Sequence, residues 1–227
     1  MRYYRLLLPA CLLYLMCMAS GAAHGVAVTD ASYIQTIQGV AFMPYLYLGA
    51  KHMVTGYDHI LFLAGVIFFL YRMKDVALYV TLFAIGHSLT LMLGVLVGLH
   101  VNAYLVDAVI GLSVVYKAFE NMGGFKRLNW QLDTRLMVWG FGLAHGFGLS
   151  TKLQDLALSR QGLISNMIGF NLGVELGQLM ALTVLLLLFN AWRHSRSFMQ
   201  RAYQANVLIM TAGFVLFGYQ LTGFFTV

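Results

Sequence analysis

Histidines and carboxylates recur inside stretches of this sequence that are otherwise apolar. Asp58 and Glu175 lie in two of these stretches. Four histidines lie in or beside three of them, namely His52, His59, His87 and His145. A charged side chain near the centre of a bilayer costs roughly 2.5–3.5 kcal/mol on insertion scales, and such residues are usually functional. Imidazole and carboxylate ligands suit zinc, nickel or cobalt better than calcium, so the sequence predicts a site for a divalent transition metal.

The first candidate cluster consists of His52, Asp58 and His59, where the chain enters its first long apolar run. In a continuous helix, residues 52 and 59 share a face, whereas Asp58 would sit about 100° round the helix. Gly56 could relax the backbone so that all three side chains converge. The alternative is a histidine at the membrane interface beside an aspartate that caps the start of a helix.

The second candidate set lies deeper in the apolar runs. His87 is midway along the second run, and His145 is central in the fourth. Asn171, Glu175 and Gln178 follow the spacing i, i+4 and i+7 on the fifth run, which predicts one polar stripe with Asn171 and Gln178 in support. A structural alternative makes His87 an interhelical hydrogen-bonding residue and Glu175 one half of a buried Glu–His pair.

The composition is that of a protein solvated mainly by lipid. Of 227 residues, 60% are hydrophobic and only 10% are charged, with a mean hydropathy of +0.77. A soluble domain usually carries about 25% charged residues. Apolar runs of about 20 residues span a bilayer as helices. The fold class expected is therefore an all-α polytopic bundle over 53–227, with six spans near 53–71, 76–99, 103–120, 135–153, 163–190 and 204–225.

The N-terminus has the pattern of a secretory signal peptide over residues 1–23. A basic start is followed by a short apolar run and by small residues up to Ala23. An uncleaved anchor is the alternative. Cys11 and Cys17 both lie in this segment, so the mature chain would have no thiolate ligand. Residues 24–52 are interpreted as a lead-in at the periplasmic surface, with a short interfacial helix.

The basic residues are distributed unevenly between the two predicted sides of the membrane. With a periplasmic mature N-terminus, one side carries nine of them: Arg72, Lys74, Lys117, Lys126, Arg127, Arg135, Arg193, Arg196 and Arg201. The other side keeps Lys51, Lys152 and Arg160. This bias predicts a multi-pass protein of the bacterial inner (cytoplasmic) membrane. It also explains the net charge of +6 without a nucleic-acid partner.

Two series of glycines at four-residue spacing indicate close helix packing. They are Gly142 and Gly146 on the fourth run, and Gly169, Gly173 and Gly177 on the fifth. Small residues at this spacing let helix backbones approach closely in lipid. We expect them to pack the fourth and fifth spans together. Asp107 is expected to cap the third span.

Four motifs in chain order resemble the HupE/UreJ family, especially its second branch, over about residues 45–180. They are His52-x5-Asp58-His59-Ile-Leu-Phe, Gly86-His87-Ser-Leu-Thr-Leu91, Phe141-Gly-Leu-Ala-His145-Gly-Phe-Gly148 and Phe170-Asn-Leu-Gly-Val-Glu175-Leu-Gly-Gln178. The best-known members are regarded as nickel permeases that accompany hydrogenase or urease maturation. The nickel-associated members carry a second motif with two histidines around a glycine and a following glutamate. Here His145-Gly146 is recognisable, and Glu175 must supply the acid.

The resemblance implies that nickel, or cobalt, passes inward through the His, Asp and Glu ligands, with a homo-oligomer or a metallochaperone as a possible partner. An alternative use of the same side chains is a zinc-dependent intramembrane hydrolase, and a third is a metal-binding accessory protein without turnover. Ligands at staggered depths favour a path, whereas ligands that converge at one point favour an enzyme. The sequence leaves open whether the two sets are two stations or one site.

Overall fold

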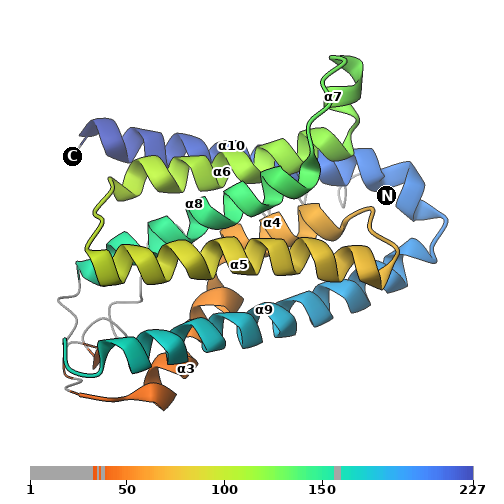
Figure 1. Ribbon diagram of the computed structural model, residues 1–227. Coiled ribbons are helices and arrows are strands. Elements are labelled where there is room, and N and C mark those ends of the chain that lie inside the picture. Colours follow the sequence, from red (N-terminus) through yellow and green to blue (C-terminus); the bar gives the residue numbers. More distant parts are fainter. Residues whose placement is uncertain (1–32, 35, 37–38, 156–159, 227) are drawn as a thin grey trace, which may run out of the picture.

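The structure is a computed structural model that describes residues 33–34, 36, 39–155 and 160–226. The predicted signal peptide and much of the predicted lead-in lie outside the described residues. Every regular element in this part of the chain is a helix, as predicted. In chain order, the helices are α3 (Phe42–Thr55), α4 (Tyr57–Ile67), α5 (Met73–Val97), α6 (Ala103–Asn121), α7 (Gly124–Arg127), α8 (Thr134–Gln154), α9 (Leu163–Arg193) and α10 (Ser197–Thr226) (Figure 1).

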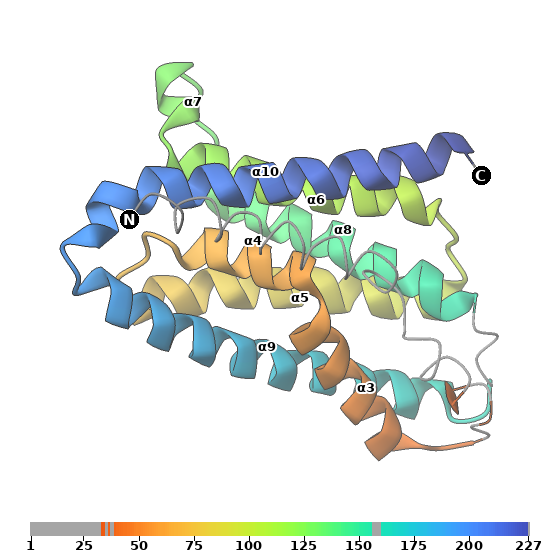
Figure 2. The same ribbon diagram turned by 180° about the vertical axis from the view of Figure 1, so that it is seen from behind.

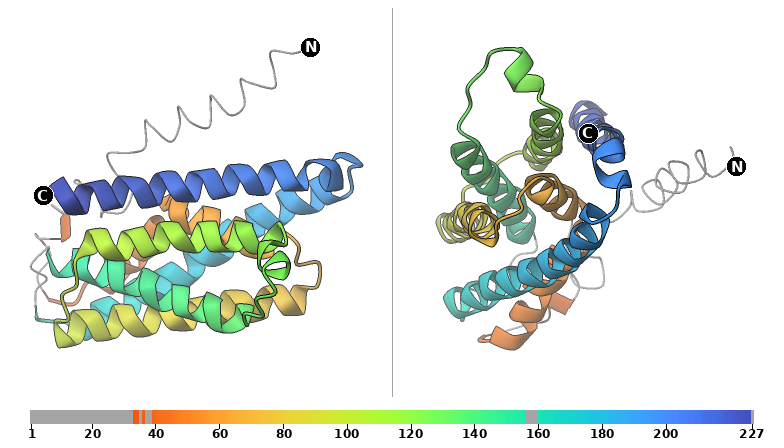
Figure 3. Two further views of the ribbon diagram at one scale, coloured as in Figure 1. Left: turned by 90° about the horizontal axis from the view of Figure 1, so that it is seen from above. Right: turned by 90° about the vertical axis from the view of Figure 1, so that its right-hand side faces the viewer.

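The long helices lie side by side around α4, which is the most central element (Figures 1 and 3). Seven of the 11 residues of α4 are buried. Among the described helices, α5, α9 and α10 are long and apolar enough to cross a bilayer by length and composition. This is a helical membrane protein whose shortest apolar helix is its core.

The outer helices form three close pairs, α3 with α9, α5 with α8, and α6 with α10. Glycines lie at each contact. A Cβ on Gly173 of α9 would overlap the backbone of Leu46 in α3, and one on Gly142 of α8 would overlap the backbone of Phe83 in α5. The glycines are packing surfaces, but their predicted pairing is wrong. The fourth span packs on the second span, and the fifth packs on α3, since the glycine faces of α8 and α9 point to different neighbours.

A helix occupies much of the described part of the predicted lead-in, in keeping with the short helix expected there. Helix α3 begins at Phe42 and lies against α9 (Figure 2). Asn166 of α9 holds its start, because the Asn166 side chain accepts a hydrogen bond from the Ala41 amide at 2.7 Å and donates one to the Gly39 carbonyl at 3.0 Å. Pro44 is tolerated because it lies in the first turn, where its missing amide has no helical partner.

The predicted first span, 53–71, is interrupted. Helix α3 ends at Thr55 and α4 begins at Tyr57, so that Gly56 separates two helices that run in different directions (Figure 2). The far end of α4 is held by Arg193, which donates to the carbonyls of Ile67 and Phe68 and so satisfies the C-terminal carbonyls of this helix.

The positions of the helix ends agree with the uneven distribution of basic residues. The predicted nine-residue side corresponds to the starts of α5, α8 and α10 and the ends of α6 and α9, which lie at one end of the bundle (Figure 1). Lys152 lies near the end of α8, at the opposite end.

Candidate metal centre

The break at Gly56 brings the first histidine cluster together. Gly56 is extended, with φ −72° and ψ 98°, and this turn lets His52 at the end of α3 face His59 at the start of α4. Their ring centroids are 5.1 Å apart. A Cβ on residue 56 would lie 2.9 Å from His59 Nδ1, closer than real Cβ contacts, so only glycine fits beside the ring.

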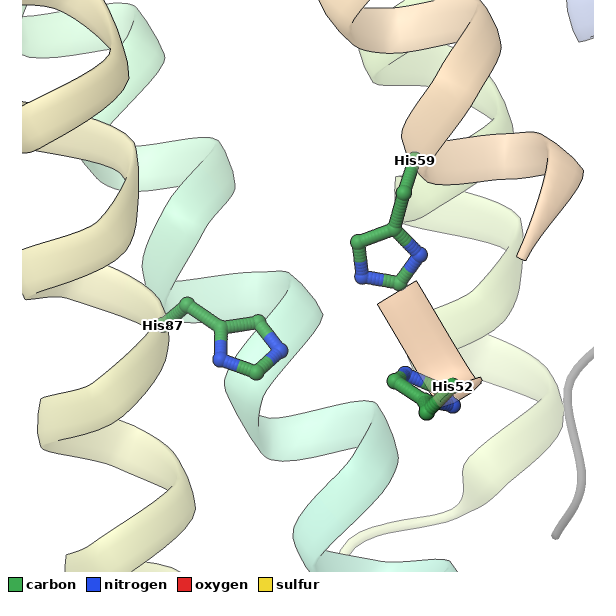
Figure 4. A group of neighbouring side chains, drawn as sticks. All are labelled: His52, His59 and His87. Carbon is green, nitrogen blue, oxygen red and sulfur yellow. The ribbon is translucent and has the colours of Figure 1, made fainter. Parts of the chain in front are cut away.

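His59 is the central residue of a larger cluster. Its ring centroid lies 5.8 Å from that of His87 on α5 and 4.9 Å from that of His145 on α8. Figure 4 shows the rings of His52, His59 and His87 directed from three helices into one space. Two overlapping triads offer ligand atoms within 4.8 Å of one another, one formed by His52, His59 and His87, the other by Asp58, His59 and His145.

The histidines of the two sets, which were expected at different depths, therefore lie in one cluster. His87 and His145 join the first cluster because α4 starts in the middle of the bundle, at the level of the central turns of α5 and α8 (Figure 2). In a continuous span over 53–71, His59 would lie near one membrane surface. The helix break moves it to the depth of the other histidines.

Two neighbouring acceptors orient the rings. Asp58 lies in the first turn of α4, where the helix dipole favours a carboxylate, and its Oδ1 is 3.1 Å from His59 Nδ1. His145 Nδ1 is 2.7 Å from the Phe141 carbonyl, which can only accept, so this nitrogen is the donor. Each contact leaves the lone pair of a neutral ring on Nε2, as is common for metal-ligating histidines.

Several nitrogens of the cluster are buried without a hydrogen bond. His59 Nε2 and both ring nitrogens of His87 have no hydrogen-bond partner within the described part of the chain. His59 is 3% exposed and His87 is 0% exposed. A buried polar group without a partner costs about 1–3 kcal/mol. Here several neighbouring imidazole nitrogens are buried without a partner. This arrangement is typical of a site in which a metal ion binds those nitrogens.

Phenylalanines enclose the cluster. The Phe83 ring lies 5.0 Å from His145 and 6.2 Å from His59, Phe62 lies 5.5 Å from His145, and Phe170 lies 6.3 Å from His52. Sequence reasoning missed this wall. Helical spacing contained the signal, because Phe62 is three residues after His59 and Phe83 is four before His87.

The predicted polar stripe on α9 is divided. Asn171 and Gln178 are buried; Asn171 donates to the Met167 carbonyl at 2.9 Å, and Gln178 donates to the Val80 carbonyl at 3.2 Å, which ties α9 to α5. Glu175 is exposed and belongs to neither triad. It lies about 40° round the helix from Asn171, and that rotation turns it out of the interior. The structure therefore does not bring Glu175 into the site.

These features define a class, a helical membrane protein whose interior holds two overlapping groups of His and Asp side chains that could bind a metal ion. The chain belongs to the HupE/UreJ family, since the model of the family described as "HupE / UreJ protein" matches residues 28–227. This confirms the resemblance seen in the motifs, and the family is associated with nickel or cobalt transport or an accessory function. Comparison with curated proteins and with solved structures gives no significant match.

Proposed function

We propose that the protein moves a divalent transition-metal ion, nickel or cobalt, inward across the bacterial inner membrane. The ion would bind at a single buried site formed by His52, Asp58, His59, His87 and His145. The family match supports the transport part of this proposal. The observation that supports the single metal site is the convergence of both triads on His59, whose Nε2 is buried without a hydrogen-bond partner in the described part of the chain. Glu175, exposed on α9, is not among the proposed ligands.

The ligand set suits the proposed ion. Four neutral imidazoles and one carboxylate are nitrogen-rich donors of the kind that nickel and cobalt prefer over calcium or magnesium. One carboxylate leaves a bound divalent ion with a net charge of about +1. The site would therefore hold the ion through coordination bonds and would not neutralise its charge fully. Such a site can release the ion as well as capture it.

The interrupted helix supports a transporter with one central site. Secondary transporters often bind their ion between the ends of discontinuous helices, in a region of irregular backbone buried in protein. Here the end of α3, the extended Gly56 and the start of α4 lie directly at the cluster. In this proposal the helices over 53–227 form six crossings, residues 1–23 are the signal peptide, and the mature N-terminus is periplasmic.

A zinc-dependent intramembrane hydrolase is the second candidate, and convergence of the ligands is the observation that favours it. Three histidines would hold zinc and leave one position for water. The metal would lower the pKa of this water, and Asp58 is the carboxylate placed to accept its proton. Tight zinc retention without ion flux would support this candidate over the transporter.

The test measures metal content and uptake in the same variants. Purified protein is loaded with nickel, cobalt or zinc, and bound metal is quantified by mass spectrometry. Uptake is followed in proteoliposomes. We expect His59→Ala and Asp58→Asn to lose stoichiometric metal and uptake, because both remove groups from a triad. Glu175→Gln is the matched control, since this carboxylate is exposed, and it should retain both. Unchanged metal content in His59→Ala would contradict the proposal.

A further inference from the structure

A second buried carboxylate lies between α6 and α8. Asp107 is 3% exposed, and its Oδ2 accepts a hydrogen bond from Lys152 Nζ at 2.6 Å. Asp107 does not cap α6, as the sequence suggested, because Asn102 accepts from the Leu105 amide and occupies that position. Asp107 lies inside the helix and holds an ion pair across to α8.

One oxygen of this carboxylate is not used by the ion pair. Asp107 Oδ1 is buried and has no hydrogen-bond partner among the described residues. A buried unpaired acceptor costs about 1–3 kcal/mol, and more when it is charged. An ion pair selected only for stability would be expected to saturate both oxygens.

The unpaired oxygen lies against α8, beside a residue that is three positions after His145. A Cβ on Gly148 would lie 3.2 Å from Asp107 Oδ1, so the oxygen packs on the backbone of this glycine. Gly148 is three residues, about 4.5 Å along the axis, beyond His145. Lys152 is seven residues beyond His145 and shares its face. The order of residues along α8 is therefore His145, then Gly148 beside the Asp107 oxygen, then Lys152, whose ammonium holds the other oxygen.

We propose that Asp107 is an additional binding station for the divalent cation, one turn outside the histidine cluster, and that Lys152 is a tethered cation which the incoming ion displaces. This inference rests on the proposed transport function. Lys152 lies near the end of α8 and its side chain is 17% exposed, so its ammonium can move outward along its flexible stem. Asp107 then offers both oxygens to the ion, which passes to His145 and Asp58.

The exchange favours divalent ions. A monovalent cation that replaces the ammonium gains no charge interaction with the carboxylate. A divalent ion doubles the Coulomb attraction at the same distance. The station would thus admit divalent cations before the nitrogen ligands of the cluster select among them.

The experiment separates equilibrium binding from flux. We expect Asp107→Asn to lower the initial rate of cobalt uptake into proteoliposomes by about tenfold or more, with metal content at the histidine cluster unchanged. Asp107→Glu, which keeps the carboxylate, should retain most of the rate. Lys152→Gln removes the internal competitor, so electron paramagnetic resonance should detect tighter binding of Mn²⁺, an ion that prefers carboxylate ligands.

The double variant Asp107→Asn/Lys152→Gln distinguishes a station from a structural ion pair. If the pair is only structural, removal of both charges restores uptake, and this result would overturn the proposal. Continued loss of uptake in a folded double variant supports it. Wild-type uptake in Asp107→Asn, or unchanged Mn²⁺ binding in Lys152→Gln, would also overturn it. Because these readouts leave the histidines intact, they fail independently of the His59→Ala test.

Discussion

Two polar sites inside this bundle, one buried and one partly buried, are built in opposite ways. The histidine cluster keeps several nitrogens without hydrogen bonds, among them Nε2 of His59 and both ring nitrogens of His87. At the other site, near the end of α6, Lys117 donates to Glu120 Oε2 at 2.5 Å, and Thr134 donates to Glu120 Oε1. Both carboxylate oxygens of this second site are used.

The difference indicates that the saturated site stabilises the fold, whereas the unsaturated cluster is built for a ligand. A saturated network recovers part of the cost of burying charge and joins the end of α6 to the start of α8. An unsaturated cluster destabilises the protein until a ligand completes it. Substitutions at the two sites should therefore change the free energy of unfolding in opposite directions.

The largest effect is expected at the saturated network. Lys117 is 7% exposed, and Lys117→Met would leave Glu120 without its charge partner. Breaking a fully buried ion pair by removal of one partner costs about 3–5 kcal/mol. Because the Glu120 side chain left behind is 23% exposed, we expect the lower end of this range. Thermal or denaturant unfolding in detergent should show this loss, whereas the metal content of the folded fraction should equal that of wild type. A variant as stable as wild type would show that the pair is not a structural element.

A smaller effect of opposite sign is expected at His87. Because His87 is fully buried and neither ring nitrogen has a hydrogen-bond partner in the described chain, His87→Leu removes an uncompensated burial cost. The metal-free protein should be stabilised by about 1–3 kcal/mol. A ligand that binds only the native state raises the melting temperature. In the variant, added nickel or cobalt should no longer have this effect. Lower stability of the metal-free variant would indicate that His87 is a structural residue.

Much of the fold followed from the sequence because it depends on local hydrophobicity. Each of the segments predicted to be apolar helices contains a helix, and the ends of α6 and α8 are within one residue of prediction. The break at Gly56 and the packing of the lead-in helix against α9 could not be predicted from the local sequence. Both depend on α9, which packs against α3 through glycines and holds residues 39–41 through Asn166.

The members of the site were easier to predict than their arrangement. Residue type alone singled out His52, Asp58, His59, His87 and His145, because polar side chains are conspicuous in apolar runs. Their depth in the membrane could not be predicted, because it depends on how the helices pack and not on the neighbouring residues in the sequence. Glu175 illustrates the same limit, since its spacing from Asn171 and Gln178 fitted a common stripe, but a rotation of about 40° places it outside.

The smallest effect is expected at Thr90, a hydrogen-bonded residue beside the histidine cluster. Thr90 Oγ1 donates to the Leu143 carbonyl at 2.7 Å and so joins α5 to α8 between His87 and His145. Gly146 approaches the same hydroxyl, and a Cβ there would overlap it. Thr90→Val keeps the shape but removes this bond. We expect a loss of about 1 kcal/mol in unfolding free energy and weaker cobalt binding, with altered d–d absorption bands because the two rings shift.

Thr90→Ser, which restores the hydroxyl, is the matched control and should recover the wild-type absorption spectrum. A change in stability without any change in the cobalt spectrum would confine Thr90 to packing. A change in the spectrum that serine reverses would make it a positioning residue for His87 and His145. In that case the hydrogen-bonded groups around the cluster hold in place the ring nitrogens that have no hydrogen bond. The unsaturated site would then depend on saturated contacts beside it.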